Sequence, residues 1–156
     1  RIGYVYVPGF AEDADAVYAA ISGAARIMGH VCPPTLMQKV IEYCAEERPD
    51  LVAYDENRNL LYSSLREMGY ECAKPDGAFY LFPDVSALYG SEWSGGRIAS
   101  SDDFCLYLLE EAGVALVPGS AFGDDACVRM SFAASDGAID MALDRVEAAV
   151  RALARR

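Results

Sequence analysis

Short apolar runs alternate with amphipathic helical segments along this chain, and their order limits the folds that it can adopt. Runs rich in β-branched and aromatic residues predict strands over residues 1–7, 70–73, 77–82, 114–117 and 127–133. Apolar residues at helical spacing, with caps or terminating glycines, predict helices over residues 12–28, from 33, over 50–68, from 101 and from 135. The order βαααββαββα predicts an α/β fold, an α+β arrangement in two layers.

The length and composition are those of an ordinary globular domain. The chain has 156 residues, of which 53% are hydrophobic and 24% are charged. A chain of this size can bury a core without disulfides or metals, and this composition is not that of a disordered tail. Two helices separate the first predicted strand from the rest, so we expect a boundary between two parts within residues 30–50.

The charge balance excludes several classes of partner. Thirteen basic and twenty-four acidic side chains give a net charge of −11, which does not suit a nucleic-acid platform or an anionic membrane surface. No run reaches the roughly 18 apolar residues of a membrane span, and no signal-peptide pattern is visible. We therefore expect a cytoplasmic protein that binds neither nucleic acid nor membrane.

The cysteines do not predict a metal site. They are Cys32, Cys44, Cys72, Cys105 and Cys127. No two of them form a CxxC pair, and His30 is the only histidine, so a zinc site would lack ligands at a known spacing. We expect no metal, and buried free thiols in a reducing cytoplasm.

A single arginine interrupts the apolar run over residues 126–133. If this run is a strand, Val128 and Met130 face one side of the sheet and Arg129 faces the other. A guanidinium on a mostly apolar strand is costly unless it meets a carboxylate or opens into a cleft. Its planar fork suits a bound carboxylate, and a structural ion pair with an acidic residue is the alternative.

Four short motifs, in the same order along the chain, resemble those of fold-type I aminotransferases that use pyridoxal phosphate. RIGY at residues 1–4 is similar to the Arg-x-Gly-Tyr element of the family, and PDGAFY at 75–80 to its Pro-x-Gly-Ala-Phe-Tyr strand. EAGVALVPGSAFG at 111–123 resembles its Ala-Gly-Val…Pro-Gly-x-x-Phe-Gly segment. VRMSFA at 128–133 resembles its C-terminal Arg-(Leu/Ile/Met)-Ser-(Phe/Tyr)-Ala strand. The sequences of these motifs most resemble those of the bacterial aspartate aminotransferase branch of class I/II.

The resemblance implies both an architecture and residue roles. Residues 1–47 would be a remnant of the large cofactor-binding domain, and residues 48–156 the C-terminal small domain. Arg1 would bind the cofactor phosphate, and Arg129 the α-carboxylate of the amino-acid substrate. Gly77 and Phe79 would lie near the substrate entrance. The intact enzyme, a homodimer, would transfer an amino group between an aspartate-like amino acid and a 2-oxo acid.

The resemblance also implies that the chain lacks part of the site. In the family the Schiff-base lysine lies just before the Arg-x-Gly-Tyr element, with the other cofactor ligands earlier still. The two lysines here, Lys39 and Lys74, are both expected to face solvent. We therefore assign no catalytic residue, and expect the chain alone to be inactive and to carry no bound pyridoxal phosphate.

Two functions of other classes stay open from the residues themselves. One is a free-standing α/β module that binds small carboxylates through Arg129. The other is a structural or oligomerising domain, because the strand edge at residues 1–7 and the apolar faces of the first two helices need a partner.

Overall fold

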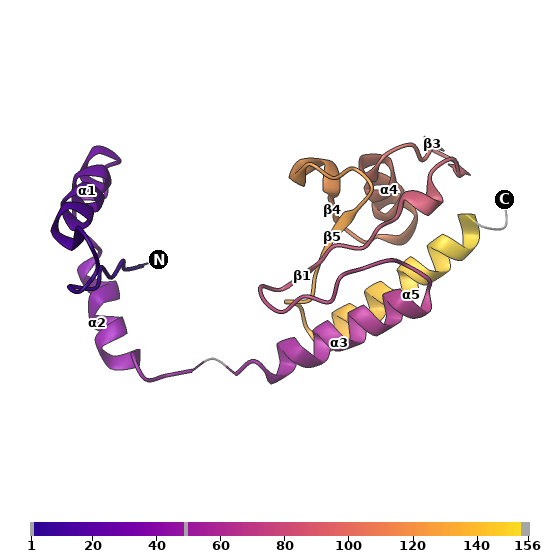
Figure 1. The fold of residues 1–156 in the computed structure, drawn as a ribbon. Helices are drawn as coiled ribbons and strands as arrows, with labels where there is room; N and C mark the ends of the chain where they lie inside the picture. Colours follow the sequence, from indigo (N-terminus) through magenta and orange to yellow (C-terminus); the bar gives the residue numbers. More distant parts are fainter. Residues whose placement is uncertain (1, 49, 154–156) are drawn as a thin grey trace. The chain divides into compact units, whose positions relative to one another are not determined.

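A computed structural model describes residues 2–48 and 50–153 of the chain. The chain divides into two compact units, Arg1–Pro49 and Asp50–Arg156 (Figure 1). The assignment of residues 1–47 and 48–156 to a large and a small domain of an enzyme stays a prediction.

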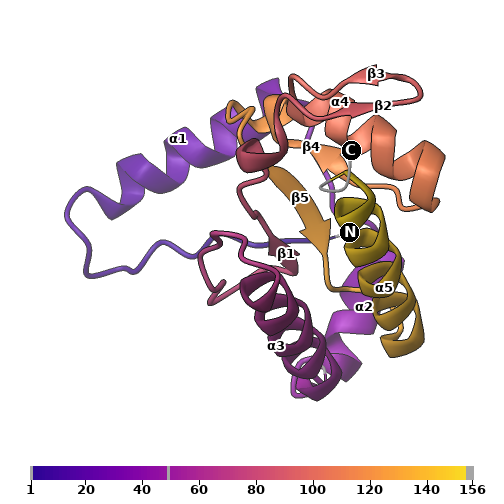
Figure 2. The same cartoon turned by 90° about the vertical axis from the view of Figure 1, so that its right-hand side faces the viewer.

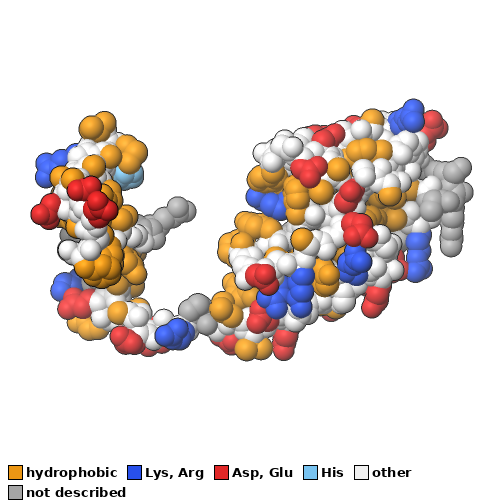
Figure 3. Space-filling view, viewed as in Figure 1, with side chains coloured by type: hydrophobic (Ala, Val, Ile, Leu, Met, Phe, Trp, Pro, Cys, Tyr) orange, Lys and Arg blue, Asp and Glu red, His pale blue; other side chains and the backbone are white. Residues whose placement is uncertain are grey.

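The first unit consists of two helices, α1 (Ala14–Ile27) and α2 (Thr35–Cys44). Gly29, with φ of +86°, follows α1 as the expected terminator. No residue among 2–48 is buried, and Phe10, Ile27 and Leu36 are among the exposed hydrophobic residues of this unit. Figure 3 shows hydrophobic side chains at the surface of the unit.

The strand that the sequence predicts over residues 1–7 is not present in residues 2–7, which form neither helix nor strand. β-Branched and aromatic residues favour extended backbone, but a strand also requires a neighbouring strand for its hydrogen bonds. No strand lies among the described residues of the first unit, so this prediction was wrong for residues 2–7.

The second unit is a small antiparallel sheet with helices packed against it (Figure 2). The strands are β1 (Tyr80–Leu81), β4 (Val117–Pro118) and β5 (Val128–Ser131), in the order β1-β5-β4. Leu81 pairs with Met130, and Val117 with Arg129. β5, the strand that contains Arg129, is therefore the central strand of the sheet.

Two long helices lie side by side on one face of this sheet, α3 (Val52–Glu67) and α5 (Asp136–Leu153) (Figures 1 and 2). Leu61 and Leu65 of α3 and Ile139 of α5 line the same apolar space as Met130 of β5. Apolar residues at helical spacing are buried in both helices, Leu61 and Leu65 in α3 and Ile139 and Val146 in α5.

The segment between β1 and β4 contains more regular structure than the sequence predicts. Residues 86–100, for which the sequence predicts neither helix nor strand, hold a 3₁₀ turn, η1 (Ser86–Leu88), and a hairpin of β2 (Glu92–Trp93) and β3 (Gly96–Arg97). Helix α4 (Ser101–Tyr107) continues into a π-helical turn, η2 (Leu108–Ala112).

The N-cap of α4 is Ser100, the residue before the predicted start of this helix at residue 101. The Ser100 hydroxyl accepts a hydrogen bond from the Asp103 amide, 3.1 Å. Ser101 is instead fully buried and hydrogen-bonded within the fold. An adjacent pair of serines offers two candidate caps, and only the tertiary contacts distinguish them.

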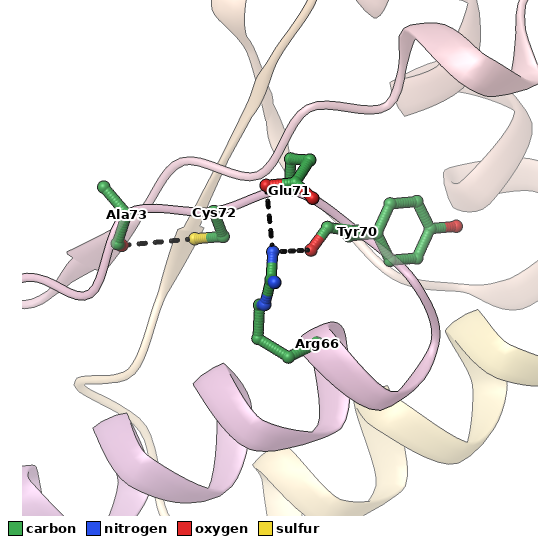
Figure 4. Close-up of polar contacts among 5 residues, drawn as sticks. All are labelled: Arg66, Tyr70, Glu71, Cys72 and Ala73. Carbon is green, nitrogen blue, oxygen red and sulfur yellow. Dashed lines mark hydrogen bonds and ion pairs between the residues drawn. The ribbon is translucent and has the colours of Figure 1, made fainter.

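Residues 70–73 do not form the expected strand, because they are held against the end of α3 (Figure 4). The Arg66 guanidinium donates to the Tyr70 carbonyl at 3.3 Å and pairs with the Glu71 carboxylate at 3.0 Å. The Cys72 thiol donates to the Ala73 carbonyl at 3.3 Å. The Tyr70 side chain points away from Arg66 and is buried in the core.

All five cysteines are free thiols. Cys105 and Cys127 are buried as expected, whereas Cys32 and Cys44 are exposed within their unit. Among residues 2–48 and 50–153, no helix is long and apolar enough to cross a membrane. The same residues contain no group of three His, Cys, Asp or Glu side chains suited to a metal ion.

Candidate functional site

Arg129 lies in the middle of the central strand, on the face opposite the core. Its neighbours Val128 and Met130 are 0% and 6% exposed, while Arg129 is half-buried and Ser131 is exposed. This is the alternation that the sequence predicts for residues 128–131. The strand therefore presents a guanidinium on the side of the sheet away from α3 and α5.

The Arg129 guanidinium contacts two aromatic rings. Its Cζ lies 4.4 Å from the centre of the Tyr80 ring and 4.5 Å from that of the Phe122 ring. No carboxylate of the described residues forms an ion pair with the Arg129 guanidinium, and none of their polar atoms forms a hydrogen bond with that guanidinium. The alternative hypothesis for Arg129, a structural ion pair with an acidic residue, is therefore not supported among residues 2–48 and 50–153.

These rings belong to a larger aromatic cluster that is partly exposed. The Phe79 and Tyr80 rings lie 4.9 Å apart, and Phe82 meets Phe122 edge-on at 6.2 Å. Phe79, Tyr80 and Phe122 are 44%, 37% and 51% exposed. Figure 3 shows hydrophobic side chains gathered at the edge of the second unit where β1 lies in Figure 1. Arg129 therefore lies within an open aromatic surface.

The turn that carries Phe122 requires a glycine at its first residue. Phe122 ends the 3₁₀ turn η3 (Gly119–Phe122), and Gly123 follows with φ of +85°. A Cβ on Gly119 would lie 2.1 Å from the Asp124 carbonyl oxygen and 2.3 Å from that of Cys127. The glycines of the PGSAFG motif thus permit the backbone path that brings Phe122 to Arg129.

A polar network fixes this turn to the start of α4. The Asp125 carboxylate accepts hydrogen bonds from the Ser101 amide at 2.9 Å and from the Ser101 hydroxyl at 2.7 Å. The Ser101 hydroxyl in turn accepts from the Ser120 amide at 3.2 Å, and the Ser120 hydroxyl donates to Asp102 at 2.6 Å. The bonds from Ser101, its hydroxyl first, lower the pKa of Asp125.

The structure brings two of the four sequence-predicted site residues to this surface. Phe79 directly precedes β1 and contacts Tyr80, which in turn contacts Arg129. Gly77 lies two residues before Phe79, and a Cβ on Gly77 would meet open space, so local packing gives no reason for a glycine there. Arg1 lies outside the described residues.

Sequence reasoning missed Tyr80 and Phe122 as neighbours of Arg129. Both lie inside motifs singled out above, but only the pairing of β1 with β5 and the η3 turn bring their rings to the guanidinium. The PGSAFG motif contained a signal, since its glycines constrain the one aromatic residue between them.

Neither lysine is placed to hold a cofactor within the described residues. The Lys39 ammonium pairs with the Glu42 carboxylate at 2.8 Å and is 67% exposed. The Lys74 ammonium lies 5.9 Å from the centre of the Tyr62 ring. Both lysines are exposed, as expected. The residues that the structure describes therefore offer no buried lysine that fits the aldehyde of pyridoxal phosphate.

A model of the aminotransferase class I and II family matches residues 1–146. The chain belongs to this family. It is 47% identical over 100 residues to the bifunctional aspartate aminotransferase and glutamate/aspartate-prephenate aminotransferase of Petunia hybrida, covering 63% of this chain and 21% of that protein. It is 43% identical over 104 residues to a probable aspartate/prephenate aminotransferase of Rickettsia felis, covering 65% of this chain and 25% of that protein.

Solved structures of the family have the same fold. An aminotransferase from Eubacterium rectale matches with a TM-score of 0.79 and 38% identity, over 98% of this chain and 35% of that one. The aspartate aminotransferase of Rhizobium meliloti matches with a TM-score of 0.68 and 34% identity, over 88% of this chain and 34% of that one.

These matches confirm the expected fold class, an α+β arrangement that forms the C-terminal portion of the fold-type I aminotransferase architecture. They also agree with the predicted likeness to the aspartate branch, since the family members matched include aspartate aminotransferases. The chain spans only about a fifth to a quarter of the curated relatives that it matches, 21% and 25% in these two cases.

Proposed function

We propose that this chain is the C-terminal part of a pyridoxal-phosphate-dependent aminotransferase. The enzyme would move an amino group between an amino acid, with an aspartate-like donor preferred, and a 2-oxo acid. The observation that carries the proposal is the half-buried Arg129, whose guanidinium is unpaired among the described residues, on a chain of the aminotransferase family. The named activities of the Petunia and Rickettsia relatives support the aspartate-like donor.

In this proposal Arg129 binds the α-carboxylate of the substrate. Its planar fork can donate two parallel charge-assisted hydrogen bonds to a carboxylate, which fixes the orientation of the substrate as well as its position. Phe79, exposed beside the Arg129 surface, and Gly77 lie near the substrate entrance in this proposal. No side chain of this chain is assigned a proton-transfer step.

The cofactor in this proposal belongs to the longer protein. Pyridoxal phosphate, when bound, supplies an electron sink that stabilises negative charge at the α-carbon of the substrate. Residues 1–47 would be part of the large domain, in which Arg1 binds the phosphate, and residues 48–156 the small domain.

We also propose that the longer protein is a cytoplasmic homodimer. The five free thiols suit a reducing compartment. The first unit, in which no described residue is buried, offers apolar surface for burial against the rest of the protein or a second subunit.

The test uses the full-length protein that contains this chain, loaded with pyridoxal phosphate. Arg129→Lys should raise KM for aspartate and lower kcat/KM by about 10- to 100-fold, because the point charge of an ammonium replaces the planar fork of the guanidinium. Arg151→Lys is the matched control, since Arg151 pairs with Glu147 on the surface of α5. Unchanged kinetics in Arg129→Lys would refute the carboxylate role.

The cofactor assignment has its own test in the 156-residue chain. This chain is titrated with pyridoxal phosphate, reduced with borohydride and mapped by peptide analysis. We expect no saturable absorption band and no single labelled lysine. Specific labelling of Lys39 or Lys74 would show that the chain forms a cofactor site of its own.

A further inference from the structure

We propose that Tyr80 and Phe122 are positioning residues that hold the Arg129 guanidinium by stacking, so that its N–H fork stays available to the carboxylate. This inference rests on the proposed function, because it concerns how the substrate-binding arginine is oriented. It assigns a role to two side chains that do not themselves bind the carboxylate in this proposal.

The two rings reach Arg129 from different parts of the chain. Tyr80 lies on β1 opposite Ser131 of β5, so its side chain is a diagonal neighbour of Arg129 on the same sheet face. Phe122 comes from η3, the turn that precedes β5. The Cζ distances of 4.4 Å and 4.5 Å are both within the range of favourable cation–π contacts.

Stacking holds an arginine without using its hydrogen-bond donors. A carboxylate partner from the protein would occupy the fork and compete with a ligand, whereas an aromatic ring attracts the cation through its π electrons. The described residues give Arg129 these two ring contacts and no ion pair. The guanidinium is thereby restricted in rotation yet has its donors free, and this preorganisation strengthens binding.

Phe122 is itself held in place. It meets Phe82 with an interplanar angle of 85°, an edge-to-face contact, and it ends a turn in which Gly119 has no room for a side chain. The Ser101 and Asp125 hydrogen bonds tie the same turn to α4. One of the two rings is therefore fixed by the fold before any ligand arrives.

The first experiment measures the stacking directly in the 156-residue chain by NMR of ¹⁵N-labelled arginine. The Nε–H signal of Arg129, assigned by its loss in Arg129→Lys, should be shifted upfield by the ring currents of Tyr80 and Phe122. The shift should shrink in Tyr80→Leu and in Phe122→Leu, and remain in Tyr80→Phe, which keeps the ring. An Nε–H signal unmoved by both leucine variants would overturn the proposal.

The second experiment measures the consequence for binding in the full-length, cofactor-loaded protein. Tyr80→Leu and Phe122→Leu should each raise KM for aspartate about three- to tenfold with little change in kcat, and Tyr80→Phe should restore it. The rate of amino-group transfer from propylamine, an amine without a carboxylate, should be the same in these variants as in the unmodified protein. Tyr62→Leu is the matched control, because its ring lies by a different cation, Lys74.

The outcomes separate the stacking from the proposed function. If Arg129→Lys raises KM for aspartate and neither leucine variant does, the stacking role is wrong and the carboxylate role stands. If Arg129→Lys itself has no effect, the carboxylate role fails and the stacking role fails with it. If the leucine variants lose activity equally toward aspartate and propylamine, with a lower melting temperature, the rings are merely structural and the proposal is overturned.

Discussion

The backbone amide of Gly119 donates a 2.9 Å hydrogen bond to the carbonyl oxygen of Cys127. This contact brings the start of η3 against the residue that precedes β5. The close approach depends on the missing side chain, because a Cβ on Gly119 would lie well inside the van der Waals distance of that oxygen.

We expect Gly119→Ala to destabilise the chain by about 2–4 kcal/mol, since backbone atoms rather than a flexible side chain occupy the space. Urea unfolding measures this change in free energy. The matched control is Gly137→Ala on α5, where a Cβ meets open space and alanine should be neutral or stabilise by up to about 1 kcal/mol. Equal stability of the two variants would contradict the packing seen at Gly119.

Two buried tyrosines should respond differently to loss of the hydroxyl, because only one of these hydroxyls has a hydrogen-bond partner in the structure described. The Tyr70 hydroxyl is buried without a hydrogen-bond partner among the described residues, whereas the Tyr107 hydroxyl donates to the Ala149 carbonyl at 2.8 Å. Tyr70→Phe should be neutral or stabilise by about 1 kcal/mol, and Tyr107→Phe should destabilise by about 1 kcal/mol. Thermal unfolding of both variants measures the difference, and a stability loss in Tyr70→Phe would contradict it.

The helices could be predicted from the sequence, and the strands only in part. Apolar spacing and the terminating Gly29 and Gly69 are local signals, so α1 and α3 begin and end close to their predicted bounds. A strand depends on its partners. The β-rich residues 2–7 have no partner strand among the described residues of their unit, and β5 covers only Val128–Ser131 of the predicted 127–133.

The candidate site followed the same division between local and distant signals. Arg129 could be singled out from a single strand, because one charge among apolar residues is a local signal. Its contacts with Tyr80 and Phe122 could not, since they depend on strand register and on the path of the η3 turn.

Acid should weaken the network around Asp125. Hydrogen bonds from Ser101 lower the pKa of Asp125 below its usual value, so its contribution to stability is present above about pH 4 and is lost as the pH falls through the folded-state pKa. The free energy of unfolding should therefore fall less steeply between pH 5 and pH 3 in Asp125→Asn. Urea titrations at stepped pH measure this slope, and Ser101→Ala should reduce it as well. Identical slopes in the three proteins would rule out this linkage.

Residues 50–156 should fold without the first unit. All buried hydrophobic residues of the described chain lie in this part, and residues 2–48 contain no buried residue. We expect residues 50–156 alone to unfold cooperatively, with a midpoint close to that of the whole chain, and residues 1–49 alone to show no cooperative transition. Calorimetry of the two pieces tests this, and a non-cooperative 50–156 piece would refute the boundary.

The alternation along β5 separates the residues that face the proposed ligand surface from those that hold the fold. Val128 and Met130 face the core, while Arg129 and Ser131 face the aromatic surface. A library randomised at residue 131, with Arg129 retained, would therefore test whether this proposed surface sets substrate preference while Val128 and Met130 keep the hydrophobic interior intact.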